Sequence, residues 1–338
     1  MAFNAEKIHQ RRRIKVIIKV QNLKKTYKTY NRGNSFAESV KSLFHRKVIN
    51  VNALKGIDFT IEKGELVALL GPNGAGKSTA LKILTGVLYP TSGDVSVMGY
   101  VPWKERKKYV AHIGAVFGQK SQLIWDIPPL DSFCLNRAIY SIPNADFKAN
   151  LDSMVEMLDV GSIIKKPTRQ LSLGERMKCE FIMAILHKPK VVFLDEPTIG
   201  LDVIAKDSIR KFIQNMNSTG TTFILTTHDL GDVEQLAKRV IVINKGEIVF
   251  DDELKGLRRH IENRKIIRIT TREPVSYFGE DGITMIRQIS PYEAELGLDV
   301  SKMKINEFIN MINMNGQIAD ISIREVPIEE VIKELYVK

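Results

Sequence analysis

The sequence predicts an α/β protein in which helices wrap a mainly parallel sheet, followed by a small α+β unit. Between residues 54 and 249, short apolar runs typical of buried strands alternate with longer segments of helical periodicity. One of these runs, 66–70, passes directly into a Gly-rich turn and then into a helix. From about residue 262 this alternation stops. A chain of 338 residues is long enough for two domains.

The N-terminus carries the chain's excess of positive charge. The formal net charge is +11, from 50 Lys and Arg against 39 Asp and Glu, and residues 1–50 account for all of the excess. We expect residues 1–13 to form a basic tail that meets acidic lipid headgroups, nucleic acid or only water.

The first domain is expected over 14–256, with an insert at 28–50 and a helical subdomain at about 120–187. Within the insert, Phe36, Val40, Leu43 and Phe44 recur at the spacing of one helical face with basic residues beside it. This short helix either packs on the domain or contacts a membrane or a partner at the membrane.

The strands of the first domain share short runs of β-branched and aliphatic residues. We expect them at 16–20, 54–61, 66–70, 95–97, 113–117, 191–194, 223–226, 240–243 and 247–249. The helices share apolar spacings of three and four, and we expect them at 77–84, 104–108, 131–140, 147–158, 171–187 and 203–217.

A second domain is expected over 262–338. Its elements share the same two patterns, with strands at 265–270, 284–289 and 318–326, a helix over 305–314 and a final helix from Pro327. The two cysteines, Cys134 and Cys179, have no metal-type spacing and are expected to be buried small hydrophobic residues in a reducing compartment. No apolar run approaches the length of a membrane helix and the N-terminus lacks an apolar signal-peptide core, so we expect no membrane crossing by the chain itself.

Residues 71–78 match the phosphate-binding loop G-x-x-x-x-G-K-[ST]. Glycines allow backbone N–H groups to fold around a phosphate, and the following helix N-terminus favours negative charge. Lys77 is expected to reach the β- and γ-phosphates, and the Ser78 hydroxyl to bind Mg²⁺. The residues expected to hold the nucleotide here are Gly71, Pro72, Asn73, Gly74, Ala75, Gly76, Lys77, Ser78 and Thr79.

A second half of a nucleotide site follows the apolar run at 191–194. Asp195 stands at the end of this buried strand, where its carboxylate can bind Mg²⁺ directly or through water. Glu196 is one residue further, points elsewhere and can act as the general base on an attacking water.

Together with four further motifs, these residues resemble the nucleotide-binding subunit of an ATP-binding cassette (ABC) transporter. The further motifs are the signature 171–175, the D-loop ending in Asp202 and the switch histidine His228, with Gln119 as the Q-loop glutamine. All stand in the family's order, and the resemblance covers about residues 14 to 253. It implies a P-loop NTPase fold of the ABC ATPase type, ATP and Mg²⁺ as ligands, and hydrolysis of ATP coupled to transport.

The resemblance implies that two such subunits, identical or different, face each other head to tail. The signature residues Ser172, Leu173, Gly174 and Glu175 of one would then close over the phosphate bound by the other, and Asp202 would lie at the same junction. This signature has Leu173 and Glu175 where glycine and glutamine are commonest. Glu175 would bring a negative charge near phosphate, and the neighbouring Arg176 is expected to compensate it. Both are variants known in the family, which favours an active site; an impaired signature is the alternative.

Two further roles follow from the resemblance. Gln119 would sense Mg²⁺ and the attacking water, while Leu123, Ile124 and Trp125 either contact a membrane partner or pack locally. His228 would contact the γ-phosphate. Tyr27 would stack on the adenine, with Tyr30 as the runner-up.

The finer resemblance is to the bacterial ABC-2 branch, in which most members are exporters. It implies integral-membrane permease subunits as partners, and a peripheral position on the cytoplasmic face of the cell membrane. The main alternative is a soluble ABC ATPase acting on nucleic acid or ribosomes, which only the basic N-terminus favours. Ribosome-acting relatives usually carry two cassettes, whereas this chain has one phosphate loop, so no nucleic acid is expected. A kinase or GTPase would not need the signature.

Overall fold

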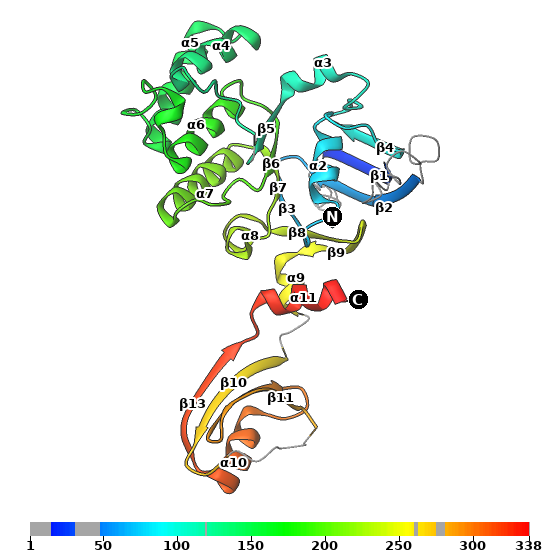
Figure 1. Cartoon of the computed structure of the whole chain (residues 1–338), viewed down its shortest axis with the longest axis vertical. Coiled ribbons are helices and arrows are strands. Elements are labelled where there is room, and N and C mark those ends of the chain that lie inside the picture. The colour runs from blue at the N-terminus through cyan, green and yellow to red at the C-terminus, as the bar shows by residue number, and fades with distance from the viewer. Residues whose placement is uncertain (1–14, 31–47, 119, 260–262, 275–280, 338) are drawn as a thin grey trace, which may run out of the picture. The chain divides into compact units, whose positions relative to one another are not determined.

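A computed structural model of the chain describes residues 15–30, 48–118, 120–259, 263–274 and 281–337 (Figure 1). The chain divides into two compact units, Met1–Asp251 and Asp252–Lys338. Within the described ranges, no helix is both long and apolar enough to span a bilayer.

A six-stranded sheet forms the centre of the first unit, in the order β5-β6-β7-β3-β8-β9. Its strands are β3 (Leu66–Leu70), β5 (Ile113–Phe117), β6 (Val191–Asp195), β7 (Thr222–Thr226), β8 (Arg239–Asn244) and β9 (Glu247–Glu253). The first five in this order pair in parallel, as predicted. Every residue of β3 and β7 is buried, because other elements cover both faces of this sheet. Parallel strands bring their carboxyl ends to one edge, so residues 71, 195 and 227 start there side by side.

A second, antiparallel sheet has the order β2-β1-β4, with β1 (Val16–Tyr30), β2 (Val48–Glu62) and β4 (Ser92–Val97). β1 and β2 are each 15 residues long, much longer than predicted. The pairs Lys28–Asn50 and Tyr30–Val48 show that both ends of the expected insert continue this hairpin. The helix predicted from Phe36 to Phe44 lies outside the described residues, as does the tail 1–13.

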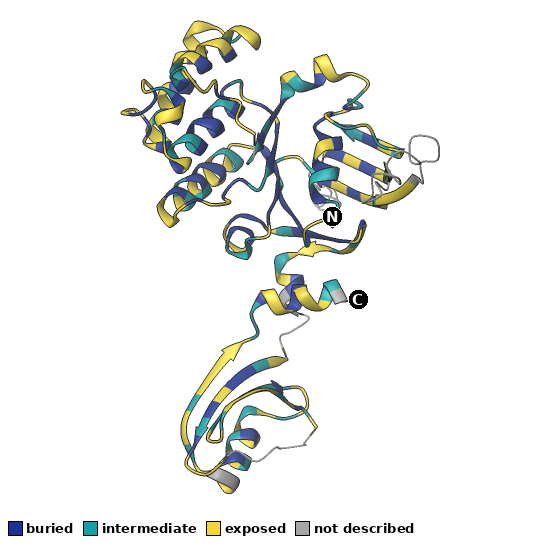
Figure 2. Ribbon diagram, viewed as in Figure 1, coloured by how far each residue is buried: buried dark blue, intermediate teal, exposed yellow. Residues whose placement is uncertain are grey.

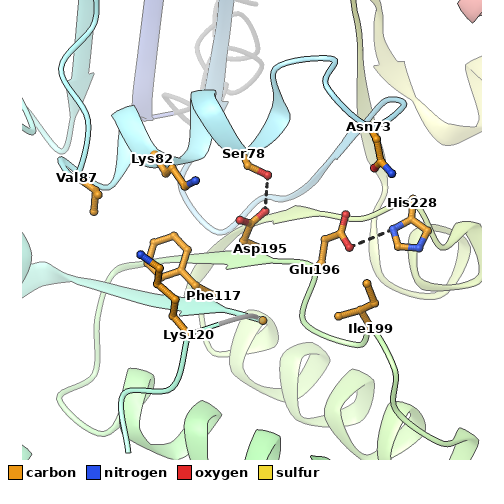
Figure 3. Close-up of a pocket in the computed structure, with 11 residues that line it drawn as sticks. Asn73, Ser78, Lys82, Val87, Phe117, Lys120, Asp195, Glu196, Ile199 and His228 are labelled. Carbon is orange, nitrogen blue, oxygen red and sulfur yellow. Dashed lines mark hydrogen bonds and ion pairs between the residues drawn. The ribbon is translucent and has the colours of Figure 1, made fainter. Parts of the chain in front are cut away.

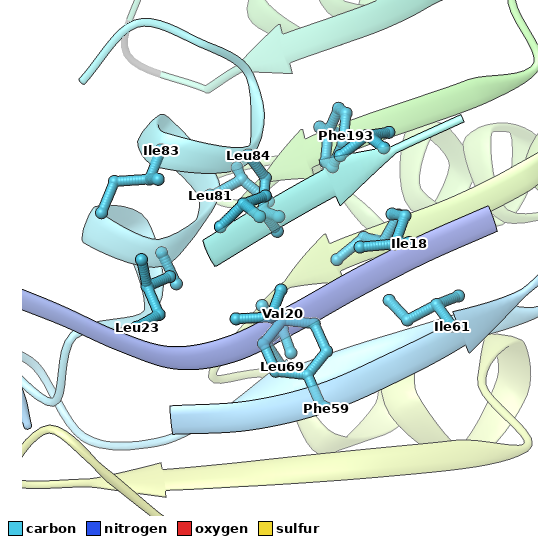
Figure 4. Packing of buried hydrophobic residues seen from close by; sticks show 14 of the residues in the cluster. Ile18, Val20, Leu23, Phe59, Ile61, Leu69, Leu81, Ile83, Leu84 and Phe193 are labelled. Carbon is cyan, nitrogen blue, oxygen red and sulfur yellow. The ribbon is translucent and has the colours of Figure 1, made fainter. Parts of the chain in front are cut away.

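Helix α2 (Lys77–Leu84) lies between the two sheets and joins their cores (Figure 4). The cluster around it is fully aliphatic and aromatic, and includes Ile18, Val20, Leu23, Phe59, Ile61, Leu69, Leu81, Ile83, Leu84 and Phe193. Each such buried side chain stabilises the fold by about 1.5–3 kcal/mol. The helix that follows the phosphate loop is therefore held from both sides.

The helical part of the first unit contains α4 (Pro129–Ile139), α5 (Asn144–Leu158), α6 (Leu173–Ile185) and α7 (Val203–Ser218), whose buried faces point inward (Figure 2). Pro129 starts α4 and Pro143 precedes α5, positions where proline favours the beginning of a helix. Phe181 of α6 meets Phe212 of α7 edge to face, with ring centroids 6.1 Å apart. The remaining short helices are α3 (Arg106–Tyr109), η1 (Val110–His112), η2 (Thr168–Gln170) and α8 (Leu230–Leu236), of which only α3 corresponds to a predicted helix, that at 104–108.

The two cysteines differ in environment. Cys179 on α6 is buried, as predicted, but Cys134 on α4 is exposed. The prediction for Cys134 was wrong because its position on α4 faces away from the core, with Phe133 taking the buried place beside it.

The second unit is a four-stranded antiparallel sheet with helices, in the order β11-β12-β10-β13. Its strands are β10 (Arg264–Thr271), β11 (Ile283–Ser290), β12 (Glu293–Asp299) and β13 (Ile318–Glu325), and its helices are α9 (Leu254–Arg259), α10 (Ile305–Gly316) and α11 (Ile328–Val337). Phe308 and Ile312 of α10 are buried against Ile267, Ile269 and Leu296 of the sheet. The sequence predicted this α+β character but missed β12, which pairs with both β10 and β11.

Candidate functional site

The phosphate loop joins β3 to α2 and is shaped by close backbone approaches. Gly71 has φ 156°, and a Cβ there would lie 2.2 Å from the carbonyl oxygen of Ile243 on β8. Gly76 has φ 113°, and a Cβ there would lie 2.6 Å from the carbonyl oxygen of Ala53. The Gly246 N–H also donates to the Ala75 carbonyl at 2.9 Å. Glycine is therefore required at both ends of the loop, because neighbouring strands leave no room for a side chain.

Lys77 opens α2 and is folded onto the loop. Its ammonium donates to the carbonyl oxygens of Gly71 at 2.6 Å and Pro72 at 3.1 Å, and the residue is only 5% exposed. Burial lowers the pKa of Lys77, while Glu196 and then Asp195 act in the opposite direction. The cation therefore lies inside the loop, with two carboxylates close enough to affect it.

A cluster of oxygen atoms forms where α2 meets β6 and β7. The Ser78 hydroxyl donates to Asp195 Oδ1 at 3.0 Å, and the Thr226 hydroxyl donates to the same oxygen at 2.6 Å. Ser78 and Asp195, separated by more than a hundred residues, are thus brought together as the sequence predicted for a shared site. Thr226 is an additional member that the sequence analysis did not identify.

Glu196 and His228 form the other side of the site (Figure 3). Glu196 Oε2 lies 3.2 Å from His228 Nδ1. The backbone of Glu196 has φ 52°, and its N–H donates to the Thr226 carbonyl at 3.0 Å. This left-handed conformation turns the chain directly after β6, so the carboxylates of Asp195 and Glu196 point to different partners, as expected.

The switch histidine precedes α8, which two ion pairs hold on α7. Lys206 Nζ lies 2.6 Å from Asp229 Oδ2, and the hydrogen bond from Lys206 lowers the pKa of Asp229. Fully buried Asp232 accepts from Arg210 Nε at 2.7 Å and from the Thr198 hydroxyl. Since Thr198 belongs to the D-loop, the D-loop and the segment around His228 are fixed to each other.

These groups open into one cavity of about 680 Å³ (Figure 3). Five of the predicted residues line it: Asn73, Ser78, Asp195, Glu196 and His228. The lining residues that were not predicted are Lys82, Val87, Phe117, Gly118, Lys120 and Ile199. Lys82 follows Ser78 by four residues on α2, so helical spacing could have identified it. Gln119 lies outside the described residues, although its neighbours Gly118 and Lys120 line the cavity.

The signature forms the start of α6 and lies outside this cavity. Ser172 caps the helix: its hydroxyl accepts from the Glu175 N–H at 3.2 Å, and its own N–H donates to Glu175 Oε2 at 2.8 Å. This reciprocal pair is a capping box. The expected partner of Glu175, Arg176, is not its partner, because consecutive helical residues point in different directions. The Arg176 guanidinium instead lies 5.7 Å from the centre of the Trp125 ring.

The signature also packs on the D-loop of the same chain. A Cβ on Gly174 would lie 2.9 Å from the Ala205 Cβ, and a Cβ on Gly200 would lie 3.3 Å from Leu173 Cδ2. Asp202 caps α7 by accepting from the Ala205 N–H at 2.8 Å. Gly174 and Asp202 therefore have local roles in joining α6 to α7, beside the nucleotide-binding roles expected of them.

Tyr27 lies on β1 next to the phosphate loop. Its hydroxyl is 3.5 Å from the Thr79 hydroxyl on α2, and the Lys25 ammonium lies 5.2 Å from its ring centre. The ring is partly exposed, so one side can receive a planar ligand. Tyr30, the runner-up, lies three residues further along β1.

Comparisons with known proteins agree with this arrangement. The family profile for ABC transporters matches residues 54–199. The linearmycin resistance ATP-binding protein LnrL of Bacillus subtilis is 28% identical over 300 residues, covering 87% of this chain and 94% of that protein. This match is longer than the first unit, so it extends into the second.

A second relative has a higher identity over a shorter match. The lantibiotic transport ATP-binding protein SrtF of Streptococcus pyogenes is 30% identical over 240 residues, covering 71% of this chain and 92% of that protein. The dimeric structure of the ATP-binding cassette MJ0796 in a post-hydrolysis state with ADP and Pi is 25% identical, with a TM-score of 0.58, covering 70% of this chain and 98% of that one. The chain belongs to the ABC transporter family, as an ATP-hydrolysing ATP-binding protein of the bacterial ABC-2 type.

Proposed function

We propose that this subunit hydrolyses ATP in the cavity between residues 73–82 and 195–228, and that it powers an exporter together with separate permease subunits. The observation that carries the proposal is the convergence of Ser78, Asp195, Glu196 and His228 on one cavity beside a phosphate loop. These residues come from one helix, α2, and from the ends of two neighbouring strands, β6 and β7, and they supply oxygen ligands and a general base beside the Lys77 ammonium.

The oxygen cluster fits Mg²⁺. Magnesium prefers hard oxygen ligands and usually binds through one or two protein groups together with phosphate oxygens and water. The Ser78 hydroxyl and the Asp195 carboxylate, 3.0 Å apart, provide such a pair. Gln119 is the third residue that we assign to the metal. When bound with ATP, the ion would neutralise charge that develops on the phosphates.

The residues of the chain itself have separate roles in ATP binding and hydrolysis. Lys77 and the loop N–H groups bind the phosphates, and Tyr27 with Thr79 receives the adenosine end. The Glu196 carboxylate takes a proton from the attacking water. With Nδ1 bonded to Glu196, His228 orients this carboxylate and presents its other ring nitrogen to the γ-phosphate.

A second ATP-binding subunit completes the site. Ser172 is exposed, and its hydroxyl accepts from Glu175 but has no acceptor for its own hydrogen among the described residues. It can therefore donate to a phosphate held by a partner. Beside the signature, Val203 and Ile204 are 82% and 81% exposed, which is unusual for adjacent apolar residues. We assign Leu173, Glu175, Gly174 and Asp202 to the same interface.

The permease contact is assigned to the loop after Gln119. Leu123 is buried, so the local-packing alternative holds for this residue, whereas Ile124 and Trp125 are 44% and 51% exposed. Relatives named for linearmycin resistance and lantibiotic transport support the assignment to an exporter. Through its permease the subunit would lie on the cytoplasmic face of the cell membrane, without nucleic acid.

The test is ATP hydrolysis by the purified chain beside Glu196→Gln, with oligomer size measured in ATP. We expect kcat to fall by roughly 10²- to 10⁴-fold, as for loss of a general base, while the variant accumulates as an ATP-bound dimer. Glu329→Gln, an exposed carboxylate of the second unit, is the matched control and should retain activity. Equal activity of Glu196→Gln and the control would contradict the assignment.

A further inference from the structure

Glu180 is a buried carboxylate that the mechanism above does not use. It lies on α6, eight residues after the signature Ser172, and is only 4% exposed. A carboxylate in such a place is unfavourable unless several donors surround it, and a well-packed apolar residue would often serve stability better. Its presence on this helix therefore needs a specific partner.

That partner is the loop that follows Gln119, which we call the 120–127 segment. The Ser121 hydroxyl donates to Glu180 Oε1, and the Gln122 N–H lies 3.1 and 3.0 Å from the two carboxylate oxygens. The Leu123 N–H is 3.5 Å from Oε1. One side chain thus orders three consecutive residues of a loop that has no secondary structure of its own here.

The start of the same segment is tied to the catalytic edge of the sheet. The Gln122 side-chain amide donates to the Ala115 carbonyl of β5 at 2.6 Å. Just before the segment, the Gly118 N–H donates to the Asp195 carbonyl at 3.0 Å, and a Cβ on Gly118 would lie 2.8 Å from the Glu196 carbonyl. A displacement of Gly118 would therefore shift the backbone of Asp195 and Glu196, whose carboxylates we assign to the site.

The other end returns to α6 and to the residues that precede it. Arg176, one turn before Glu180, lies over the Trp125 ring at 5.7 Å, and Arg169 pairs with Asp126 at 3.0 Å. These two contacts are exposed and weak, whereas the Glu180 carboxylate is buried and accepts several hydrogen bonds. Glu180 is accordingly the principal attachment between the segment and the signature helix.

We propose that Glu180 is a positioning residue for ATP hydrolysis: it holds the 120–127 segment on α6, so that the cavity-lining residues Gly118 and Lys120 and the signature move together. This inference rests on the proposed function, since the signature acts on nucleotide only in a dimer. The physical basis is a chain of hydrogen bonds, centred on the buried Glu180 carboxylate, that links two functional elements through one rigid helix.

The segment contains its own reporter. The chain has two tryptophans, and in a Trp103→Phe background Trp125 is the only one. We would compare this parent with Glu180→Gln, in which an NH₂ group replaces one acceptor and faces donors. Glu156→Gln, an exposed carboxylate on α5, is the matched control. The readouts are acrylamide quenching of Trp125 without nucleotide, and kcat and KM for ATP.

We expect Glu180→Gln to raise the quenching constant of Trp125 and to lower kcat by roughly 2- to 30-fold, the range found for residues that couple two sites. KM for ATP should stay within about twofold of the parent, because Glu180 does not line the cavity. Quenching and kcat equal to those of Glu156→Gln would overturn the inference.

Two further measurements cover the cases in which a variant does not fold or the parent has no ATPase activity. If Glu180→Gln fails to fold, Ser121→Ala removes one donor only, and it should change quenching and kcat in the same directions by smaller factors; no change would overturn the inference. If the parent shows no ATPase activity, the proposed function fails. The nucleotide-free quenching then decides separately whether Glu180 holds the segment.

Discussion

Ser172 and Glu175 exchange two hydrogen bonds in the first turn of α6, one in each direction between backbone N–H and side chain. The negative charge of Glu175 is therefore engaged by the helix start of its own subunit. Its departure from the commoner glutamine is compatible with an active signature, because glutamine and glutamate both complete a capping box.

Glu175→Gln should preserve the stability of the chain and its ATPase activity, since the amide oxygen can still accept from the Ser172 N–H. Glu175→Ala should lower the free energy of unfolding by about 0.5–2 kcal/mol, the usual cost of losing a capping interaction. Urea unfolding of both variants beside Glu156→Ala would measure this. Equal losses for Gln and Ala at position 175 would show that the box contributes nothing.

Gly174→Ala should be destabilising by about 1–3 kcal/mol, because the new Cβ would meet the Ala205 Cβ at 2.9 Å and force α6 from α7. The double variant Gly174→Ala with Ala205→Gly should recover part of the lost free energy of unfolding. The recovery is incomplete by about 1 kcal/mol, because glycine at position 205 is unfavourable in a helix. Thermal unfolding of the two single variants and the double variant measures the interaction. Strict additivity would rule out the contact as the cause.

His187 should make the chain less stable in acid. Its Nε2 is 2.9 Å from the Ile113 carbonyl oxygen, its ring stacks on Tyr140 at 4.0 Å, and its Nδ1 has no partner among the described residues. Burial lowers the pKa of His187 to about 4. The unfolded chain, with a pKa near 6.5, binds a proton first, so stability falls as the pH drops from about 6.5 to about 4.

Between about pH 6.5 and about pH 4, the titration of His187 should lower the free energy of unfolding by an amount on the order of 1–3 kcal/mol. His187→Gln removes the titrating ring and should flatten this part of the stability profile. His112→Gln should keep the acid-sensitive part, because His187 is still present. A profile that is unchanged in His187→Gln would assign the acid sensitivity to other groups.

The two thiols should react at very different rates with a disulfide reagent at pH 8. Cys134 is exposed, whereas burial raises the pKa of Cys179 to about 12 and keeps it protonated. We expect one rapidly reacting thiol per native chain and two after unfolding in denaturant. Cys134→Ser should abolish the rapid phase, and a rapid phase that survives in this variant would place Cys179 at the surface.

Tyr27→Ala should weaken ATP binding by about tenfold or more, because stacking of a base on an aromatic ring contributes about 1–3 kcal/mol. Tyr27→Phe keeps the ring and loses only the contact with the Thr79 hydroxyl, so it should bind nearly normally. Titration with a fluorescent ATP analogue checks both. Full affinity in Tyr27→Ala would favour Tyr30, and Tyr30→Ala would then be the next variant.

The sequence predicted the parallel sheet and the edge that carries the site well, because one continuous apolar run leads into the phosphate loop after Leu70 and another leads into the carboxylates Asp195 and Glu196. Such runs are buried on both faces and leave little ambiguity. The second unit was harder. Strand β12 alternates Ala294, Leu296 and Leu298 with acidic residues and Gly297, and this half-buried pattern of period two was overlooked.

The site was predictable where a motif names its residues, and not where contact depends on tertiary packing. The Ser172-x-x-Glu175 spacing is typical of a capping box and predicts the partner of Glu175, whereas the sequence neighbour Arg176 does not pair with it. Thr226 and Glu180 carry no such signal. Their partners, Asp195 and Ser121, are distant in the chain and come within reach only through the order of the strands and the packing of α6.

The approach of Gly71 to the Ile243 carbonyl has a consequence for protein engineering. The backbone of β8 packs against the phosphate loop at Gly71, and the backbones of Ala53 and Gly246 make two more contacts with the loop. If residues 71–78 were grafted between another strand and helix, the loop would keep its glycines but lose the backbone contacts that restrict them. The grafted loop would then adopt many conformations. A working graft would need to include the strand that provides Ile243.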